Sequence, residues 1–250
     1  MEFHEAVAIV TGGGRGFGRA FAEEILAGRG KVMITDVNVH ELQATGKELQ
    51  GKYGEQNVCW DRQNVTEKDS FSRAFAYASK YFNKPVNVLA NNAGIAGDMT
   101  FYQPESTSWE AVFAIGEFKR TLNGKEGVIV NLGSMAALSP TPFGPDYAAA
   151  KAGVVGFTRS LYQLKKSDNI RCFCMCPGFA ETNMGQQADE EVPKYTNMMG
   201  GLMPVKVVVD AFAAGLREPD NAGRVLRIMN KGTAYYRFPG DKTLFPNSKL

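Results

Sequence analysis

Histidine and cysteine are scarce in this chain of 250 residues, and neither sign of charge dominates it. The two histidines, His4 and His40, are not placed for a catalytic triad, and the Gly-x-Ser-x-Gly motif of many hydrolases is missing. No Gly-x-x-x-x-Gly-Lys-Ser/Thr run occurs, which disfavours a kinase or nucleotide triphosphatase. The formal net charge is only +2, with Lys and Arg scattered, so nucleic acid is not an expected partner.

The chain also lacks long apolar runs and a surplus of cysteine. No stretch approaches a membrane span. The first apolar run, residues 6–10, begins too early to leave room for a signal peptide, so we expect a reducing compartment. Three of the four cysteines, Cys172, Cys174 and Cys176, alternate along one predicted strand and share one face. Because no histidine or fourth ligand is near them, we interpret them as core residues and expect no metal site.

The chain does contain a regular alternation of apolar runs and amphipathic segments. Strands are predicted at 6–10, 31–35, 57–60, 86–90, 128–132, 170–176 and 225–229, and helices at 20–26, 37–50, 70–82, 148–164 and 207–216. This alternation predicts right-handed crossovers and a parallel sheet with helices on both faces. We expect one α/β domain over residues 1–250, a doubly wound Rossmann fold of about seven strands, with a C-terminal tail from about residue 231.

A glycine-rich run, residues 11–18, follows the first predicted strand and leads into a helix. Glycines in such a turn let backbone N–H groups and the helix dipole meet a pyrophosphate without an obstructing side chain. A flexible turn without a ligand is the alternative. The second predicted strand reaches Asp36 at about the distance that a dinucleotide site requires, which favours cofactor binding.

Asp36 indicates which dinucleotide binds. Its carboxylate can accept hydrogen bonds from the adenosine ribose hydroxyls and would repel a 2′-phosphate, which favours NAD over NADP. Arg15 argues the other way, because a guanidinium in this loop could pair with that phosphate. Asp36 could instead cap the helix that follows it.

Tyr147 and Lys151 are four residues apart at the start of a predicted helix, so both side chains project from one face. A free tyrosine hydroxyl has a pKa of about 10, and an adjacent ammonium together with a cationic nicotinamide would stabilise the phenolate. Ser134, at the end of the fifth strand, could hold the oxygen of an alcohol or carbonyl substrate.

The glycine turn, the run Asn91-Asn92-Ala93-Gly94, Ser134 and the Tyr147–Lys151 pair occur in the order typical of one family. The chain resembles the short-chain dehydrogenases/reductases over nearly its whole length, which implies a Rossmann-fold oxidoreductase. Residues 176–179 and 223–233 are similar to the NAD-dependent 15-hydroxyprostaglandin dehydrogenase branch.

The resemblance implies roles for individual residues. It makes Ser134, Tyr147 and Lys151 catalytic, and it places Ser134, Gly144, Tyr147 and Phe179 against the substrate. It implies contacts with an NAD cofactor from Thr11, Gly12, Arg15, Gly16, Phe17, Gly18, Asp36, Asn64, Val65, Asn91, Ala93, Gly94, Tyr147, Lys151, Pro177, Gly178, Ala180 and Thr182.

Some of these matches are more specific than others. Thr11 and Asn91 resemble the residues that brace the glycine turn against the fourth strand. Asn64 stands where many members have an aspartate for the adenine amino group, with Asp61 as the alternative match. Gly144 stands where the prostaglandin enzymes carry a substrate-facing glutamine.

One stretch departs from the family. The family's fourth catalytic residue is an asparagine that follows an apolar run like residues 109–115, and here Gly116 follows. The stretch from Ile115 to Asn131 is also shorter by roughly a dozen residues, about three helical turns. In the family that asparagine holds a water next to the lysine, so proton exchange would suffer unless Asn123 or a loop water substitutes. The same helix packs against a partner subunit in the family, so a homo-oligomer would have a reduced interface.

Two functions follow from this sequence. The first is an NAD-dependent oxidoreductase that interconverts a secondary alcohol and a ketone on an apolar, lipid-derived substrate. Its pocket lid would be residues 179–204, with apolar contacts, or ordinary core residues, at Met184, Tyr195, Met198, Met199, Leu202 and Met203. The second is a catalytically impaired NAD-binding protein that acts through binding or assembly.

The last three residues, Ser248, Lys249 and Leu250, match the signal read by the peroxisomal import receptor, which favours a peroxisome over the cytoplasm.

Overall fold

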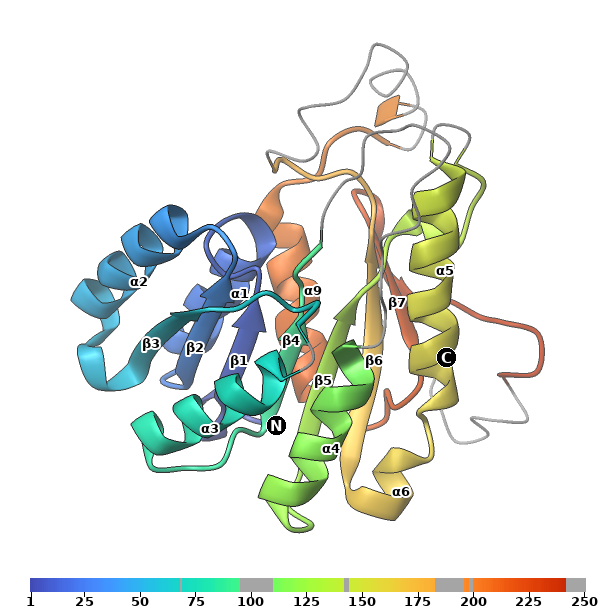
Figure 1. Ribbon diagram of the computed structural model, residues 1–250. Coiled ribbons are helices and arrows are strands. Elements are labelled where there is room, and N and C mark those ends of the chain that lie inside the picture. Colours follow the sequence, from blue (N-terminus) through green and yellow to red (C-terminus); the bar gives the residue numbers. More distant parts are fainter. Residues whose placement is uncertain (68, 95–109, 142–143, 183–195, 198–199, 242–250) are drawn as a thin grey trace.

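The chain forms one twisted sheet with helices on both faces, as the computed structural model shows (Figure 1). The structure describes residues 1–67, 69–94, 110–141, 144–182, 196–197 and 200–241, and only the backbone of residues 110–114. Within these residues the strand order is β3-β2-β1-β4-β5-β6-β7-β8. The strands are β1 (Val7–Thr11), β2 (Lys31–Asp36), β3 (Val58–Arg62), β4 (Val88–Asn91), β5 (Gly127–Leu132), β6 (Ile170–Pro177), β7 (Val225–Met229) and β8 (Gly232–Tyr235).

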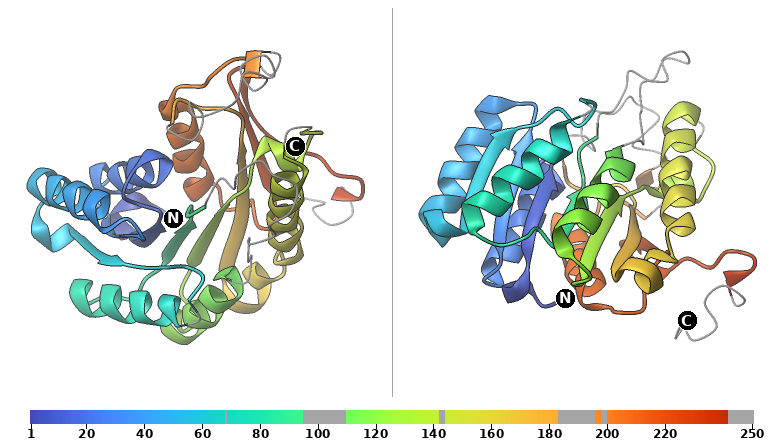
Figure 2. Two further views of the ribbon diagram at one scale, coloured as in Figure 1. Left: turned by 45° about the horizontal axis from the view of Figure 1, so that its top comes forward. Right: turned by 60° about the horizontal axis from the view of Figure 1, so that its bottom comes forward.

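Helices cover the two faces of this sheet in two groups (Figure 2). One face carries α1 (Gly16–Ala27), α2 (Val39–Tyr53) and α9 (Val205–Arg217), and the other carries α3 (Ser70–Phe82), α4 (Glu110–Leu122), α5 (Pro145–Ser160) and α6 (Leu164–Asp168). The central strands are buried on both sides, which explains why they are nearly continuous apolar runs. Aromatic pairs join the helices within each group: Phe21 and Phe212 stack with ring centres 4.3 Å apart, and Phe75 meets Phe118 edge to face at 5.3 Å.

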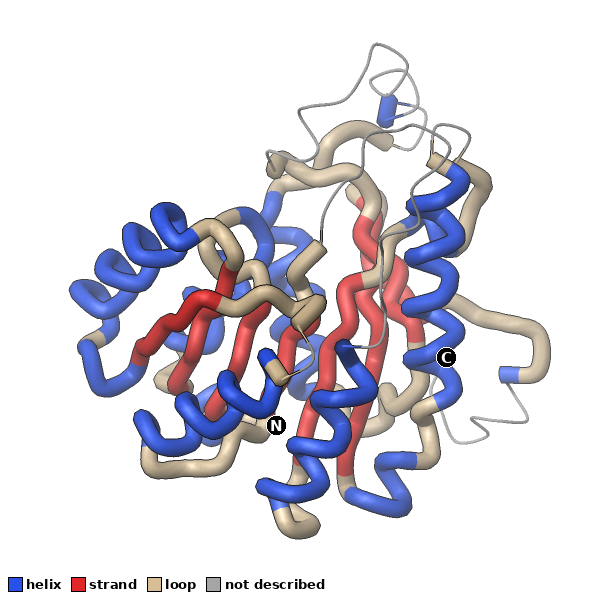
Figure 3. The backbone as a smooth tube through the Cα atoms, in the orientation of Figure 1, coloured by secondary structure: helices blue, strands red, loops and turns tan. Residues whose placement is uncertain are grey.

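The predicted fold class is confirmed, and the seven predicted strands lie within one or two residues of the observed ones. The helix over 70–82 is confirmed at both ends. The predicted helix 148–164 is wrong in part, because it begins at Pro145, ends at Ser160 and is followed by the separate α6. The expected tail is also wrong at its start, because residues 232–235 turn back beside β7 as β8, the one antiparallel strand that the described part of the sheet contains (Figure 3).

All four cysteines are free and buried. Cys172, Cys174 and Cys176 share one face of β6, as predicted, and the sulfurs of Cys174 and Cys176 lie 3.9 Å apart. Burial raises the pKa of the Cys172 thiol to about 12, which keeps it protonated and unreactive near neutral pH.

No group of three metal-ligating side chains occurs among the described residues. Nor does any helix in the described ranges have the length and apolar character of a membrane span.

A fully buried arginine fixes the end of α9. The Arg171 guanidinium donates to the carbonyl oxygens of Gly215 (2.9 Å) and Leu216 (2.8 Å) and to Asn221 Oδ1 (2.7 Å). These carbonyls lie in the last turn of α9, where an α-helix leaves its carbonyl groups without internal partners. Arg171 therefore acts as a buried C-terminal cap.

Replacing Arg171 with methionine should lower the free energy of unfolding by about 2–4 kcal/mol, because three buried acceptors each lose one hydrogen bond, although the Gly215 carbonyl keeps another, from Asn221 Nδ2. Urea denaturation measures this loss. Lys166→Met, which removes an exposed cation from α6, is the control and should change stability by less than about 0.5 kcal/mol. Equal losses in the two variants would contradict the capping role.

Candidate functional site

The predicted site residues gather at the carboxyl ends of the parallel strands. The glycine turn follows β1, Asp36 ends β2, Asn64 follows β3, and Asn91 ends β4. Ser134 follows β5, Pro177 ends β6, and the first turns of α5 carry Tyr147 and Lys151. In open α/β sheets this edge is where ligands bind.

Close backbone approaches fix the glycine turn. A Cβ on Gly18 would overlap the Gly12 carbonyl oxygen, and Gly12 itself has a φ of +63° with Ala93 packed against it. Gly16, at a φ of +56°, has nothing within 4 Å of where its Cβ would be among the described residues. No side chain caps the first turn of α1 in the described part of the chain, so its N–H groups are available to a ligand. The turn thus has the shape and the free donors that a pyrophosphate needs.

Thr11 ties the turn to the end of β4. Its hydroxyl donates to the Ala90 carbonyl (3.3 Å) and accepts from the backbone N–H groups of Asn92 (3.1 Å) and Ala93 (3.0 Å). The Asn92 amide donates in turn to the carbonyls of Thr11 (2.9 Å) and Gly12 (3.1 Å). The bracing role predicted for Thr11 is confirmed.

The same role predicted for Asn91 is wrong, because Asn92 performs it. Asn91 is still part of β4 and lies opposite Asn131 of β5, and its side chain turns toward that strand. Asn92 has left the sheet, so its side chain is free to reach over the turn. The adjacent Asn-Asn pair was the available signal, but the sequence did not show which residue leaves the strand.

Asp36 lies between the glycine turn and the start of α2. Its Oδ2 accepts from the Gly14 N–H (3.1 Å) and its Oδ1 from the Asn38 N–H (3.0 Å). The alternative that Asp36 caps the helix is wrong, because Asn38 is the N-cap and its side chain accepts from the Glu41 N–H. Arg15 is not free either, since its Nη1 lies 3.3 Å from Glu41 Oε1. Sequence reasoning missed Glu41, because a glutamate in a first helical turn is unremarkable without the fold.

Asn64 and Val65 follow β3 at the same edge of the sheet. Asn64 Oδ1 accepts from the Thr66 N–H (3.1 Å) and the Thr66 hydroxyl (2.9 Å), which makes a tight turn there. Val65 packs against the core beside α3. The alternative match, Asp61, lies within β3 itself, which is consistent with Asn64 as the residue after the strand.

Ser134, Tyr147 and Lys151 surround the end of β5. Ser134 Oγ accepts from the Ala136 N–H (3.2 Å), so its hydrogen can still be donated elsewhere. Lys151 Nζ donates to the Leu132 carbonyl (2.9 Å) and lies 5.7 Å from the centre of the Tyr147 ring. Because Leu132 precedes Ser134 by two residues, the lysine brings the start of α5 to the strand end that carries the serine.

A buried chain of polar groups joins β4, β5 and α5 beneath these residues. Asn91 Nδ2 donates to Asn131 Oδ1 (2.8 Å), Asn131 Nδ2 donates to Thr158 Oγ1 (2.9 Å), and Thr158 Oγ1 donates to the Val154 carbonyl (2.8 Å). Asn131 and Thr158 are almost completely inaccessible to solvent. This chain fixes α5 against the strands, and sequence reasoning missed it because its members come from three separate segments.

Thr158→Val should lower the free energy of unfolding by about 1–3 kcal/mol, because the buried Asn131 amide loses its main acceptor. Thr121→Val is a matched control, since Thr121 Oγ1 also donates one turn back, to the Glu117 carbonyl, at 2.7 Å. Its loss should be clearly smaller, because no buried side-chain amide among the described residues depends on the Thr121 hydroxyl. Urea denaturation of both variants tests this prediction. Equal losses in the free energy of unfolding would show that the buried hydrogen bonds of Asn131 and Thr158 have no special stabilising role.

The stretch after β6 continues the site. The Gly178 N–H donates to the Ile228 carbonyl (2.9 Å), and Ala180 pairs with Met203 in an isolated bridge. Thr182 is the last described residue before a gap, and its N–H donates to the Ala180 carbonyl (2.7 Å). Among the predicted lid residues Met203 is buried in the core and Leu202 is exposed, while Met184, Tyr195, Met198 and Met199 lie outside the described residues.

Asn123 is not placed to act as the family's fourth catalytic residue. Asn123 directly follows α4 and precedes β5, so it lies at the amino end of that strand. The six residues of β5 separate it from Ser134, about 20 Å at 3.3 Å per residue. Gly116 is within α4 and has nothing near its Cβ position among the described residues. The substitution by Asn123 is therefore wrong.

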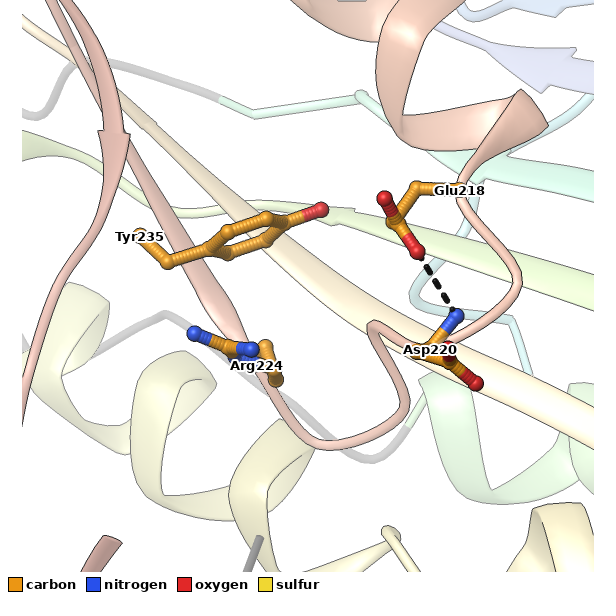
Figure 4. Close-up of a pocket in the computed structure, with 4 residues that line it drawn as sticks. All are labelled: Glu218, Asp220, Arg224 and Tyr235. Carbon is orange, nitrogen blue, oxygen red and sulfur yellow. Dashed lines mark hydrogen bonds between the residues drawn. The ribbon is translucent and has the colours of Figure 1, made fainter. Parts of the chain in front are cut away.

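A small cavity lies at the opposite edge of the sheet. Glu218, Asp220, Arg224 and Tyr235 line it, close to the start of β7 (Figure 4). The Arg224 guanidinium lies 4.3 Å from the centre of the Tyr235 ring, and Glu218 Oε1 accepts from the Asp220 N–H. With about 60 Å³, the cavity is far smaller than the 300 Å³ or more of typical ligand pockets, so it is not the candidate site.

Comparison with known proteins decides what this arrangement belongs to. The family described as short chain dehydrogenase matches residues 6–193, well over half of the chain. The chain is a member of this family. It is therefore an oxidoreductase, and the reaction class is the interconversion of alcohols and ketones.

Individual relatives agree with this assignment. The 3-oxoacyl-(acyl-carrier-protein) reductase of Aquifex aeolicus is 31% identical over 196 residues, 74% of this chain and 78% of the relative. The NAD(+)-dependent 15-hydroxyprostaglandin dehydrogenase of Rattus norvegicus is 28% identical over 271 aligned positions, 99% of this chain and 98% of the relative. The structure of a 7α-hydroxysteroid dehydrogenase with NADH and 7-oxo glycochenodeoxycholic acid superposes with a TM-score of 0.80 at 22% identity, covering 90% of this chain and 93% of that one.

The alignment with the Rattus norvegicus enzyme is longer than the present chain. An alignment of 271 positions against a chain of 250 residues leaves at least 21 positions without a residue from this chain.

Proposed function

We propose that this protein is an NAD-dependent dehydrogenase that interconverts a secondary alcohol and a ketone on an apolar, lipid-derived substrate. The proposal is supported by the position of Lys151, which binds the Leu132 carbonyl two residues before Ser134 and lies 5.7 Å from the Tyr147 ring centre, on the same edge of the sheet as the glycine turn. The relatives named above include enzymes of prostaglandins and bile acids, which supports a lipid-derived substrate.

The residues present fit a dinucleotide. The open side of the turn at Gly16 and the uncapped first turn of α1 suit the pyrophosphate. Asp36 suits the adenosine ribose hydroxyls, and its negative charge disfavours a 2′-phosphate. Val65, Asn91, Gly94 and the Pro177–Thr182 stretch complete the proposed contacts, and bound NAD supplies the hydride acceptor.

In the proposed mechanism the deprotonated Tyr147 oxygen accepts the proton of the substrate oxygen when the alcohol is oxidised, and the Tyr147 hydroxyl returns a proton to this oxygen when the ketone is reduced. The Ser134 hydroxyl donates a hydrogen bond to that oxygen and holds it against the tyrosine. The Lys151 ammonium, 5.7 Å from the ring centre, stabilises negative charge that develops on the phenolic oxygen. The Leu132 carbonyl holds this ammonium in place.

The position three residues before the tyrosine carries no side chain, because it is Gly144. Gly144 is the N-cap of α5, and a Cβ there would lie 3.5 Å from Tyr147 Cβ. This distance is an ordinary van der Waals contact, so the position could carry a side chain next to the tyrosine. Because the prostaglandin enzymes that the chain resembles carry glutamine there, we propose that its substrate differs from theirs, with Phe179 as an apolar contact.

A second candidate function is an NAD-binding protein with impaired catalysis. Gly116 at the expected place of the family's asparagine and the position of Asn123 at the far edge of the sheet favour it. Such a protein would act by binding or assembly.

Turnover separates the two candidates. Purified protein is mixed with NAD and a panel of secondary alcohols that includes prostaglandin E2, hydroxysteroids and 2-octanol, and reduced cofactor is followed by its absorbance. Turnover supports the dehydrogenase, and saturable NADH binding without any turnover across the panel supports the second candidate. Tyr147→Phe controls for contaminating activity.

We also propose import into peroxisomes, on the basis of Ser248, Lys249 and Leu250, which lie outside the described residues. Removing these three residues from a protein tagged at its N-terminus should move it from peroxisomes to the cytosol in cells. An unchanged punctate location would contradict the proposal, and so would a cytosolic location of the intact chain.

A further inference from the structure

Arg15 and Asp36 have opposite effects on the binding of a 2′-phosphate at the adenosine ribose. The carboxylate disfavours a 2′-phosphate, while a free guanidinium in the glycine turn would attract one. The structure pairs Arg15 with Glu41, with 3.3 Å between Nη1 and Oε1. Arg15 remains largely exposed, at 62% of its side chain, so the pair is open to solvent.

The backbone around Glu41 is held firmly against the turn. Glu41 is the third residue of α2, and its N–H donates to the side chain of the N-cap Asn38 (3.2 Å). One turn further along α2, the Thr45 hydroxyl donates to the Gly14 carbonyl (2.7 Å) and is buried. These contacts hold the start of α2 against the glycine turn. The Glu41 side chain is therefore positioned near Arg15 by the fold.

Two charged side chains, Arg15 and Glu41, and one helix terminus therefore lie near Asp36. The N-terminus of α2 and Arg15 favour an anion, whereas Asp36 and Glu41 oppose one. Glu41 acts twice, since it occupies the guanidinium and adds a second negative charge. A ribose with free hydroxyls carries no charge and loses little from either effect.

We propose that Glu41 is a specificity-determining residue that excludes NADP by masking Arg15. This inference rests on the proposed function, because it requires a dinucleotide with its adenosine ribose at Asp36. It explains how a chain with an arginine in the glycine turn can still prefer NAD.

The test measures the dissociation constants of NADH and NADPH by titration calorimetry, which needs no turnover. Glu41→Gln should raise the affinity for NADPH relative to NADH on the order of tenfold, from the released guanidinium and the removed repulsion. In an Arg15→Gln background, Glu41→Gln should also raise the affinity for NADPH relative to NADH, but the increase should be roughly threefold smaller, since no guanidinium is left to release.

Glu48→Gln is the matched control. Glu48 lies two turns further along α2 and pairs with Arg19 of α1, so this variant removes an equal charge from the same helix and breaks a similar pair. It should leave the ratio within about twofold of the wild type. A gain from Glu48→Gln equal to that from Glu41→Gln, no gain from Glu41→Gln, or a gain independent of Arg15 would each overturn the inference. Absence of NADH binding by the wild type would instead overturn the proposed function on which it rests.

Discussion

Tyr147→Phe is expected to lower kcat by about 10²–10⁴-fold, because the variant has no hydroxyl to exchange the substrate proton. The aromatic ring stays beside Lys151, so binding of NADH should persist and the loss should fall on the chemical step. Steady-state rates at saturating NAD, with a secondary alcohol found in the panel, measure the effect. Calorimetry with NADH shows separately that the site is intact.

Tyr162→Phe provides the matched control for the loss of a phenol. Tyr162 lies just beyond the end of α5, where its hydroxyl accepts from Gln163 Nε2 (3.0 Å). Tyr147 lies in the first turn of α5, so the length of this helix separates Tyr162 from the candidate site. Its kcat should stay within about twofold of the wild type. If Tyr147→Phe retained comparable turnover, the tyrosine would not be the proton-exchanging group.

Gly18→Ala is expected to weaken NADH binding roughly 100-fold, which corresponds to losing about two hydrogen bonds to charged phosphate. The new Cβ would overlap the Gly12 carbonyl oxygen and come within 2.6 Å of Asn92 Nδ2, so the backbone of the turn must move. That movement displaces the N–H groups that face the pyrophosphate. Overpacking should also cost about 1–3 kcal/mol of stability.

Gly51→Ala is the control for Gly18→Ala, because it replaces a glycine outside the turn and should not weaken NADH binding. Gly51 lies in α2, where its Cβ would meet nothing within 4 Å among the described residues. The variant should bind NADH normally and gain up to about 1 kcal/mol of stability from the better helix propensity of alanine. Normal NADH binding by Gly18→Ala, measured by calorimetry, would show that the turn does not hold the cofactor in the way described.

The sheet could be predicted from the sequence because its strands are apolar runs bounded by turns. Central strands such as β1 and β6 are buried on both faces, and so their composition alone distinguishes them. β8 could not be predicted in the same way, because it is short and largely exposed, and its pairing with β7 depends on a turn rather than on an apolar face.

The candidate site could be predicted where a local pattern decides it. The glycines of the turn and the four-residue spacing of Tyr147 and Lys151 are both local, and the structure places them at one edge of the sheet. Asn92, Glu41 and the pair of Asn131 with Thr158 depend on which strand end or helix turn lies opposite. Such long-range pairings are set by the register of the fold, which a single sequence does not reveal.

Calorimetric titration of NADH and NADPH into the wild-type protein tests the central claim most directly. One NADH per chain should bind with a dissociation constant in the micromolar range, and NADPH should bind at least about tenfold more weakly. Absence of heat with both nucleotides, or tighter binding of NADPH, would contradict the assignment of this edge of the sheet to an NAD site.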